Sequence, residues 1–115
     1  MNRRLKYSDR LDATFSALSD ATRRGVLERL GTGETSISDL AASFDMTLTG
    51  MKKHVSVLEG AGLVSTRKVG RVRRCKLSQR RLDDELGWLA GFRLMMESRL
   101  DGLGEFLERT KGDEL

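Results

Sequence analysis

Positive charge is concentrated in the middle third of the sequence. Residues 47–81 contain ten Lys and Arg residues and one acidic residue, whereas residues 1–46 are balanced and residues 82–115 carry nine acidic and four basic residues. The net charge of the 115-residue chain is +4, so the middle block holds the whole positive excess. Such a cluster of cations is typical of a surface that binds a polyanion, nucleic acid above all.

The first cations of this block open an amphipathic helix, LTGMKKHVSVLEG. At 100° per residue, one side of it forms a predicted core face with Leu48, Met51, Val55 and Leu58. Lys53 lies on the opposite, polar face. A helix in the DNA major groove reads base edges mainly with its N-terminal residues, and a glycine there lets the backbone approach. We therefore predict DNA contacts from Thr47, Thr49, Gly50, Lys52, Lys53 and His54.

The remaining cations lie in a segment with the pattern of a β-hairpin. Stretches rich in Val, Thr and alternating residues flank Val69 and Gly70, which predicts a hairpin, or wing, over residues 63–77. From Arg67 to Arg81 there are eight basic residues and no acidic residue. A two-stranded ribbon holds such cations against the DNA backbone or in a minor groove. The predicted wing contacts are Lys68, Arg71, Arg73 and Arg74.

We call the amphipathic helix LTGMKKHVSVLEG the reading helix. Short helices must precede and position it. Residues 1–7 are predicted to be a flexible basic arm, followed by a first helix whose apolar face includes Leu11 and Phe15. Asp20 has the type and position of an N-cap for a second helix, which Gly31 ends.

The third and fourth helices are predicted to form a helix-turn-helix over residues 36–61. Ser36 is followed three residues later by Asp39, a variant of the capping box, and Thr47 is suited to cap the reading helix. A short helix, a brief turn and a second amphipathic helix are the parts of this DNA-binding motif.

The C-terminal third of the sequence predicts one long helix over residues 79–111. Leu, Phe and Met recur at intervals of three and four residues for several turns, and Trp88 widens the apolar stripe. Gly102 and Gly104 weaken the helix prediction toward its end. This stripe is larger than the short first helix covers, so a second copy of the chain is predicted to pack on it.

Three motifs in this order resemble the ArsR/SmtB family of winged helix-turn-helix repressors, in its subgroup without metal-sensing sites. They are LSDATRRGVLERL, SISDLAASFDMTLTGMKKHVSVLEGAGLV and GRVRRCKL, and the resemblance covers nearly the whole chain. The chain departs from the family pattern at Ala21 and Thr49, where relatives often have proline, and at Lys52, where they often have serine. The last two changes bear on which operator sequence is read.

The resemblance implies a mainly α-helical, single-domain fold with five helices and a small β-hairpin. It also implies a cytoplasmic homodimer that pairs through its first and last helices, binds a twofold-symmetric operator in double-stranded DNA and blocks transcription. The interface residues expected on this basis are Leu11, Phe15, Leu89, Phe92, Met96, Leu100 and Leu103.

Metal sensing and redox sensing are disfavoured by the residues present. Metal-sensing relatives place a cysteine pair in the third helix, where this chain has Ser36 and Ser38, and one Cys and one His far apart in sequence do not build a site. Cys75 alternates with Leu77 on the second hairpin strand, which favours an inward-facing, structural thiol over a redox sensor.

Other residues and function classes leave narrower alternatives. His54 either touches a phosphate or hydrogen-bonds within the fold. Arg23 and Arg24 are interpreted as structural, with Arg24 able to pair with Glu28. The sequence shows no catalytic triad, phosphate-binding glycine loop or nucleotide fingerprint, so we expect neither an enzyme nor a cofactor.

The alternative functions are a protein-interaction module and a ligand- or redox-responsive regulator with the same fold. No secretory signal and no apolar run of about 18 residues are evident, so a cytoplasmic protein without membrane contact is expected. The sequence identifies no small-molecule effector.

Overall fold

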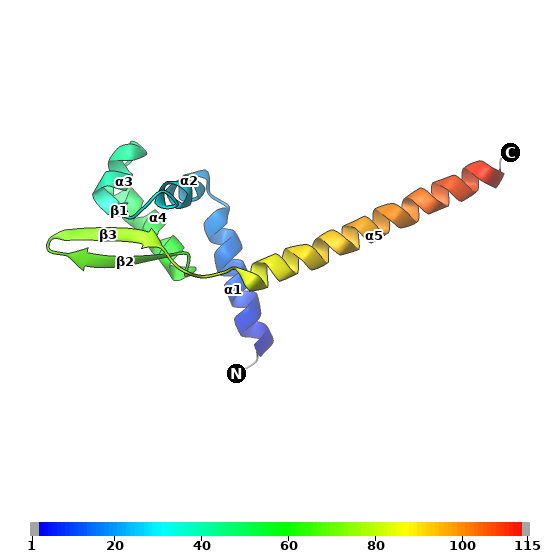
Figure 1. The fold of residues 1–115 in the computed structure, drawn as a ribbon, viewed down its shortest axis with the longest axis horizontal. Helices are drawn as coiled ribbons and strands as arrows, with labels where there is room; N and C mark the ends of the chain where they lie inside the picture. The colour runs from blue at the N-terminus through cyan, green and yellow to red at the C-terminus, as the bar shows by residue number, and fades with distance from the viewer. Residues whose placement is uncertain (1–2, 114–115) are drawn as a thin grey trace. The chain divides into compact units, whose positions relative to one another are not determined.

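The computed structural model describes the backbone of residues 3–113 and the side chains of residues 6–102, 104 and 107. In the described part, five helices and three strands follow one another as α1 (Arg3–Leu18), α2 (Ala21–Leu30), β1 (Thr35–Ser36), α3 (Ile37–Ser43), α4 (Leu48–Gly60), β2 (Val64–Val69), β3 (Val72–Leu77) and α5 (Asp83–Asp113) (Figure 1).

The chain divides into two compact units, Met1–Arg81 and Leu82–Leu115, and each is described by itself. The first unit contains α1 to β3 and the second contains α5. α5 is a single helix whose described apolar side chains are largely at the surface.

The predicted hairpin is present and belongs to a three-stranded antiparallel sheet with the order β1-β3-β2. β2 and β3 pair from Val64 opposite Leu77 to Val69 opposite Val72. The two-residue strand β1 pairs with the other edge of β3, with Thr35 opposite Cys75. β1 is too short to produce a periodic pattern, so sequence reasoning missed it. We call residues 64–77 the wing.

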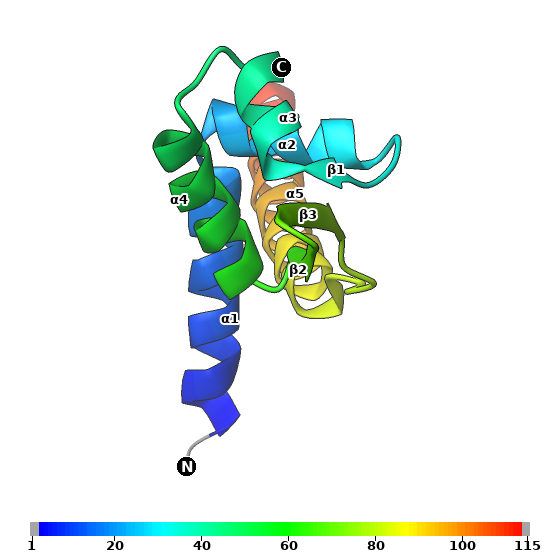
Figure 2. The same cartoon turned by 90° about the vertical axis from the view of Figure 1, so that its left-hand side faces the viewer.

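The core of the first unit lies among α1, α2, α3, α4 and the sheet. Met51, Val55 and Leu58 on α4 are at most 2% exposed, as the helix periodicity predicts. α4 packs against α1, α2 and α3, and Figure 2 shows it alongside α1. Leu48 is a correction: it is 43% exposed, because α4 begins at this residue and its neighbours cover only the following turns. The other buried apolar residues of this unit are Leu11, Ala17, Val26, Leu30, Ile37, Leu40, Ala41, Ala61, Leu63, Val64 and Cys75.

All three predicted N-caps are confirmed. The Asp20 carboxylate accepts a hydrogen bond from the Arg23 backbone N–H at 3.0 Å, and the Ser36 hydroxyl accepts one from Asp39 N–H at 3.0 Å. The Thr47 hydroxyl accepts the Gly50 N–H at the same distance. Each cap satisfies a backbone donor that the first helical turn leaves without a partner. These caps fix where α2, α3 and α4 begin.

The end of α1 is capped by side chains from α2. Arg23 donates from Nε to the Ala17 carbonyl at 2.8 Å and from Nη2 to the Ser16 carbonyl at 3.0 Å, and Arg24 Nη1 donates to the Leu18 carbonyl at 2.8 Å. The structural interpretation of both arginines is therefore confirmed. The partner found for Arg24 is a helix-terminal carbonyl, where the sequence suggested Glu28; charged donors at this position satisfy free carbonyls and the helix dipole together.

The backbone of residues 3–7 is helical, because α1 begins at Arg3. A flexible arm over residues 1–7 is thus wrong for these five residues, and residues 1–2 lie outside the described part. The basic composition of this stretch misled the sequence reading: Arg, Leu and Lys are good helix formers, so charge alone does not keep them out of a helix.

Both helices of the helix-turn-helix end with the same hydrogen-bond pattern. After α4, Gly62 N–H donates to the Glu59 carbonyl at 2.9 Å and Leu63 N–H to the Leu58 carbonyl at 3.0 Å, with Gly62 at φ +74°. This is the Schellman motif, which needs a left-handed residue. After α3, the corresponding left-handed residue is Asp45, at φ +52°. The left-handed backbone at Asp45 therefore sets the short turn between α3 and α4.

The second unit is the helix α5, described by itself. It begins at Asp83, after Leu82 at φ +61°, and not at residue 79 as predicted. Asp83, Asp84 and Glu85 form an acidic first turn, which the positive end of the helix dipole favours. The helix continues through Gly102 and Gly104 to Asp113, so these glycines do not end it.

Two glycines at the end of α4 give opposite expectations. Gly62→Ala forces a side chain into the left-handed region and should lower the free energy of unfolding by about 1–2 kcal/mol. Gly60→Ala, at a helical position where an added Cβ meets nothing within 4 Å, should leave it unchanged or raise it by up to about 1 kcal/mol. Urea denaturation of the two variants measures both. Equal effects would contradict the assigned helix end.

Candidate nucleic-acid interface

The N-terminal turn of α4 displays polar and basic side chains toward solvent. Thr49, Lys52 and Lys53 are exposed, and Thr47 is exposed while its hydroxyl caps the helix. Gly50 is partly buried: a Cβ added there would lie 3.1 Å from the Thr47 Oγ1 and 3.3 Å from the Met46 Cε. The glycine therefore keeps the capped turn compact. Backbone N–H groups and cations share this end of the helix, which suits it to phosphates and base edges.

The turn of the wing presents one more cation at its tip. Val69 and Val72 are paired, so Gly70 and Arg71 form a two-residue connection. Gly70 has φ +63°, the conformation in which a type II′ turn requires glycine at its first central position. Arg71 follows it and is exposed. The tight turn thus holds a guanidinium at the end of the ribbon.

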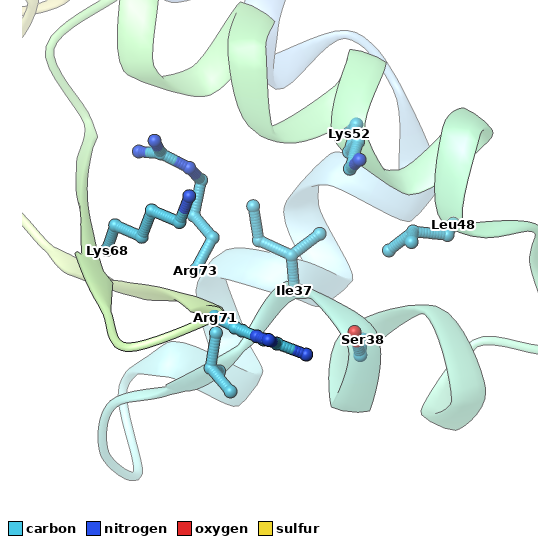
Figure 3. Close-up of a pocket in the computed structure, with 8 residues that line it drawn as sticks. Ile37, Ser38, Leu48, Lys52, Lys68, Arg71 and Arg73 are labelled. Atoms are coloured by element: carbon cyan, nitrogen blue, oxygen red, sulfur yellow. The ribbon is translucent and has the colours of Figure 1, made fainter.

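A cavity of about 320 Å³ joins the reading helix to the wing. Lys52 comes from α4, and Lys68, Arg71 and Arg73 come from the wing (Figure 3). Figure 3 shows the Arg71 side chain extending toward Ser38 at the start of α3. Four of the eight lining residues are basic and four are uncharged; the uncharged ones are Ile37, Ser38, Leu48 and Val72.

The crowding of four cations around one cavity favours an anionic occupant. Like charges repel, and their field is strongest where protein walls exclude water, so an entering anion is attracted to them together. Four of the ten predicted DNA contacts are brought together here, although Lys52 is sixteen residues from Lys68 in the sequence.

Strand alternation separates the cations of the wing onto two faces. Lys68 lies opposite Arg73, and Arg67 lies opposite Arg74, so the two pairs point to opposite sides of the ribbon. On the face of Arg73, a relay ties the wing to α4: Arg73 Nη1 donates to the Thr66 Oγ1 at 3.1 Å, and that hydroxyl donates to Glu59 at 2.8 Å. The relay sets the position of the wing against the reading helix.

On the other face, Arg67 and Arg74 share the carboxylate of Glu34. Arg74 Nε donates to Glu34 Oε1 at 2.9 Å and Arg67 Nη2 donates to the same oxygen at 3.1 Å. The hydrogen bonds of Arg74 and then of Arg67 hold the pKa of the Glu34 carboxyl below its ordinary value. Arg74, a predicted DNA contact, is thus bonded within the protein. Sequence reasoning did not single out Glu34, which is 40 residues from Arg74.

His54 lies at the junction of α4 with α2. Its Nδ1 is 3.3 Å from Arg23 Nη1 and 3.8 Å from the carboxylate of Asp20. The backbone N–H of Arg23, above all, lowers the pKa of that carboxyl. Of the two interpretations of His54, the structure has the one in which it hydrogen-bonds within the fold. A contact of its other ring nitrogen with DNA stays a prediction.

Comparisons with known proteins match this arrangement. A sequence family described as a helix-turn-helix domain matches residues 18–67. The crystal structure of an ArsR family transcriptional regulator is 41% identical, with a TM-score of 0.72, and the match covers 79% of this chain and 94% of that one. The chain belongs to the ArsR family of transcriptional regulators. It is a transcriptional regulator with a winged helix-turn-helix fold that binds DNA.

Two more distant similarities extend over most of this ArsR-family chain. It is 28% identical over 82 residues to the transcriptional repressor SdpR of Bacillus subtilis, covering 71% of this chain and 91% of SdpR. A homodimeric winged helix-turn-helix DNA-binding domain from Mycobacterium bovis is 22% identical, with a TM-score of 0.64, and the match covers 89% of this chain and 92% of that domain. The latter likeness shows the fold alone.

The described part of this ArsR-family regulator offers little to a metal ion. Within it, no three His, Cys, Asp or Glu side chains gather in an arrangement that could hold one. At the two positions where metal-sensing relatives are expected to carry cysteines, Ser36 is the N-cap of α3 and Ser38 lies in its first turn. None of the helices, over the residues described, is long and apolar enough to cross a membrane.

Cys75 is a buried thiol on β3. It is 0% exposed, which confirms the inward orientation predicted from alternation. Burial, followed by the charges of Glu59 and Glu34, raises the pKa of the Cys75 thiol to about 11. A thiol reacts as its thiolate, so both the burial of Cys75 and its raised pKa disfavour reaction at neutral pH.

Native protein treated with iodoacetamide at neutral pH should therefore retain an unmodified Cys75. The same protein in denaturant should be fully modified, because the thiol is then exposed and its pKa returns to the ordinary range. Mass spectrometry of both samples measures the difference. Modification of the native protein at the rate of the unfolded one would revive a redox-sensing role.

Proposed function

We propose that this regulator is a transcriptional repressor that binds a twofold-symmetric operator as a homodimer. Each protomer inserts the N-terminal part of α4 into a major groove, and its wing holds the flanking phosphates. The two half-sites lie about one helical turn, roughly 34 Å, apart. The observation that carries the proposal is the cavity in which Lys52 of α4 meets Lys68, Arg71 and Arg73 of the wing.

The division of labour within this surface follows from where each side chain lies. Lys53 and Thr49 are exposed on the polar face of the first turns of α4, where a major-groove helix meets base edges. The cations of the wing and Lys52 surround the cavity, which suits phosphate contacts that are independent of sequence. Binding therefore combines a sequence-reading helix with an electrostatic clamp.

The apolar surface of α5 supports a dimer. Leu89, Phe92 and Met96 are 45%, 43% and 47% exposed, and Leu100 is 63% exposed. Apolar side chains at this spacing form a continuous stripe, and a stripe of this length on a soluble chain is typical of a protein–protein interface. Leu11 is buried within the protomer and Phe15 is partly buried. The side chain of Leu103, the remaining predicted interface residue, lies outside the described ones.

The printed descriptions of two similar proteins agree with repression and with a dimer. The name of SdpR describes a transcriptional repressor, and the domain from Mycobacterium bovis is described as homodimeric. A dimer with a twofold axis presents two identical reading heads, so the matching DNA sequence is palindromic. Repression then follows when the operator overlaps a promoter, because the bound dimer blocks access to it.

A protein-interaction module is the alternative from another class. In it, the exposed stripe of α5 binds a different protein and the winged unit reads no operator. The four cations around one cavity favour DNA, because an interaction module has no need of them. A gel shift with upstream DNA at two salt concentrations discriminates the two, since a pure interaction module shows no sequence preference.

Lys53 and Arg73 should have different effects on DNA binding. Lys53→Ala should reduce the preference for operator over random DNA by about 1–3 kcal/mol, because it removes a base-reading side chain. Arg73→Gln should weaken binding to operator DNA and to random DNA alike. It should also reduce the slope of log K against log salt by roughly one unit, the signature of one lost phosphate contact. Fluorescence anisotropy over a salt series measures both.

Arg93→Gln is the charge-matched control for these two variants, because Arg93 pairs with Glu97 on α5. It should leave the operator preference and the salt slope unchanged. If Arg93→Gln reduced the slope as much as Arg73→Gln, the effect would report net charge and not the cavity.

The stripe on α5 gives a separate test of the dimer. Phe92→Glu should convert the protein to a monomer at micromolar concentration, because it places a charge in the buried centre of the interface. Leu94→Glu is the matched control: Leu94 is 66% exposed and lies two residues, or 200°, around the helix, so the dimer should persist. Sedimentation velocity measures both. A monomeric wild-type protein would contradict the proposal.

A further inference from the structure

We propose that Glu34 is a positioning residue for DNA binding, which withholds Arg67 and Arg74 from the duplex and leaves the phosphates to the cations around the cavity. The inference rests on the proposed function, because it concerns how the wing meets DNA. Glu34 lies in the connection between α2 and β1, outside the helix-turn-helix and the wing. Its role is to decide which cations of the wing are available.

The position of Glu34 is fixed by the sheet. β1 begins at the next residue and pairs with β3, with Thr35 opposite Cys75 and Ser36 opposite Arg74. This pairing brings the carboxylate to the face of the wing that carries Arg67 and Arg74. Arg74 is held twice, since its Nη2 also donates to the Glu34 backbone carbonyl at 3.4 Å.

The contacts of Arg67 and Arg74 with Glu34 differ in kind from the contact of Arg73 on the opposite face of the wing. One carboxylate, 24% exposed, serves two guanidiniums, of which Arg74 is 36% and Arg67 is 62% exposed. Charge-assisted hydrogen bonds of this type are among the stronger polar contacts. On the cavity face, Arg73 bonds to the neutral Thr66 hydroxyl, and the carboxylate of Glu59 is joined to it only through that hydroxyl. A carboxylate therefore holds Arg67 and Arg74 directly, whereas none holds Arg73 in this way.

The two arginines are within reach of a duplex held by the tip of the wing. Arg74 is three residues from Arg71 along the chain, about 10 Å at the rise of a strand. DNA carries one phosphate charge for roughly every 1.7 Å of its axis. Released guanidiniums would find phosphates close by and would add contacts that carry no sequence information. Glu34 thus favours specificity by limiting non-specific attraction.

A contribution to stability explains the cluster of Glu34, Arg67 and Arg74 less well than a role in DNA binding does. Arg67 is largely exposed, and ion pairs of exposed side chains contribute little to the free energy of unfolding, because water and salt screen them. The same pairs have a large effect on a polyanion, since each phosphate contact changes the salt slope by about one unit. The salt dependence of DNA binding is therefore the property that separates a positioning role from a merely structural one.

The test measures binding of a random-sequence duplex over a salt series. Glu34→Gln should steepen the slope of log K against log salt by up to about two units, so that affinity falls roughly tenfold more between 50 and 200 mM salt than in the wild-type protein. Glu28→Gln is the control: Glu28 is exposed on α2, and its substitution changes the net charge equally. Its slope should equal that of the wild-type protein.

Two further variants keep the test decisive. Arg67→Gln with Arg74→Gln in the wild-type background should leave the slope unchanged, because these side chains do not meet DNA. Both changes added to Glu34→Gln should return the slope to the wild-type value. The double arginine variant in the wild-type background tests the inference even if Glu34→Gln folds poorly.

The opposite results overturn the inference. A Glu34→Gln slope equal to that of Glu28→Gln shows that the carboxylate withholds nothing. A shallower slope for the double arginine variant shows that Arg67 and Arg74 contact DNA in the wild-type protein. If the wild-type protein binds no duplex, the proposed function fails and this inference with it; if it binds and only the variants disagree, the function stands without this role for Glu34.

Discussion

The burial of one face of α4 is the constraint on which the DNA-binding surface depends. Met51, Val55 and Leu58 are almost completely buried, and burying each such side chain stabilises the fold by about 1.5–3 kcal/mol. An exposed ion pair contributes about 0–1 kcal/mol. The apolar face therefore decides how α4 is rotated, and Lys53 and Thr49 face outward as a consequence. The caps at Thr47 and Gly62 then fix where the helix begins and ends.

The same reasoning applies to the wing, with a period of two residues in place of 3.6. Burial of Cys75 fixes the register of β3, and a slip by one residue would exchange the face of Arg73 with that of Arg74. Every other position then acquires its electrostatic role from its neighbours. Arg73 bonds to the neutral hydroxyl of Thr66 beside the cavity, whereas Arg74 bonds to the carboxylate of Glu34. Two adjacent arginines in the sequence thus acquire different partners in the fold.

Local patterns predicted the elements better than the contacts between them. The N-caps at Asp20, Ser36 and Thr47, the core face of α4 and the hairpin were all predictable, because each depends on residues within about one or two turns. The strand β1, the contact of His54 with Arg23 and the bonds of Arg74 to Glu34 were not, since they join residues 31 to 40 apart in the sequence. Periodicity carries no information at that range.

Charge alone was also an unreliable guide at single positions. It identified the cationic block correctly, and four of the predicted contacts do line one cavity. It gave no means of distinguishing Arg73 from Arg74, or a flexible arm from the first turns of α1. Those distinctions depend on which carboxylate or carbonyl lies nearby in the folded chain, as with Arg24 and the end of α1.

In the proposed dimer, the apolar stripe of α5 and the cations of the first unit act on the same equilibrium. A single reading head makes few phosphate contacts and binds weakly at physiological salt. Joining two heads at the spacing of a helical turn makes the second binding step intramolecular, so the affinities combine. Residues 82–115 carry nine acidic and four basic residues, so their field repels a duplex. The helix that joins the heads therefore does not compete for DNA with the surfaces that read it.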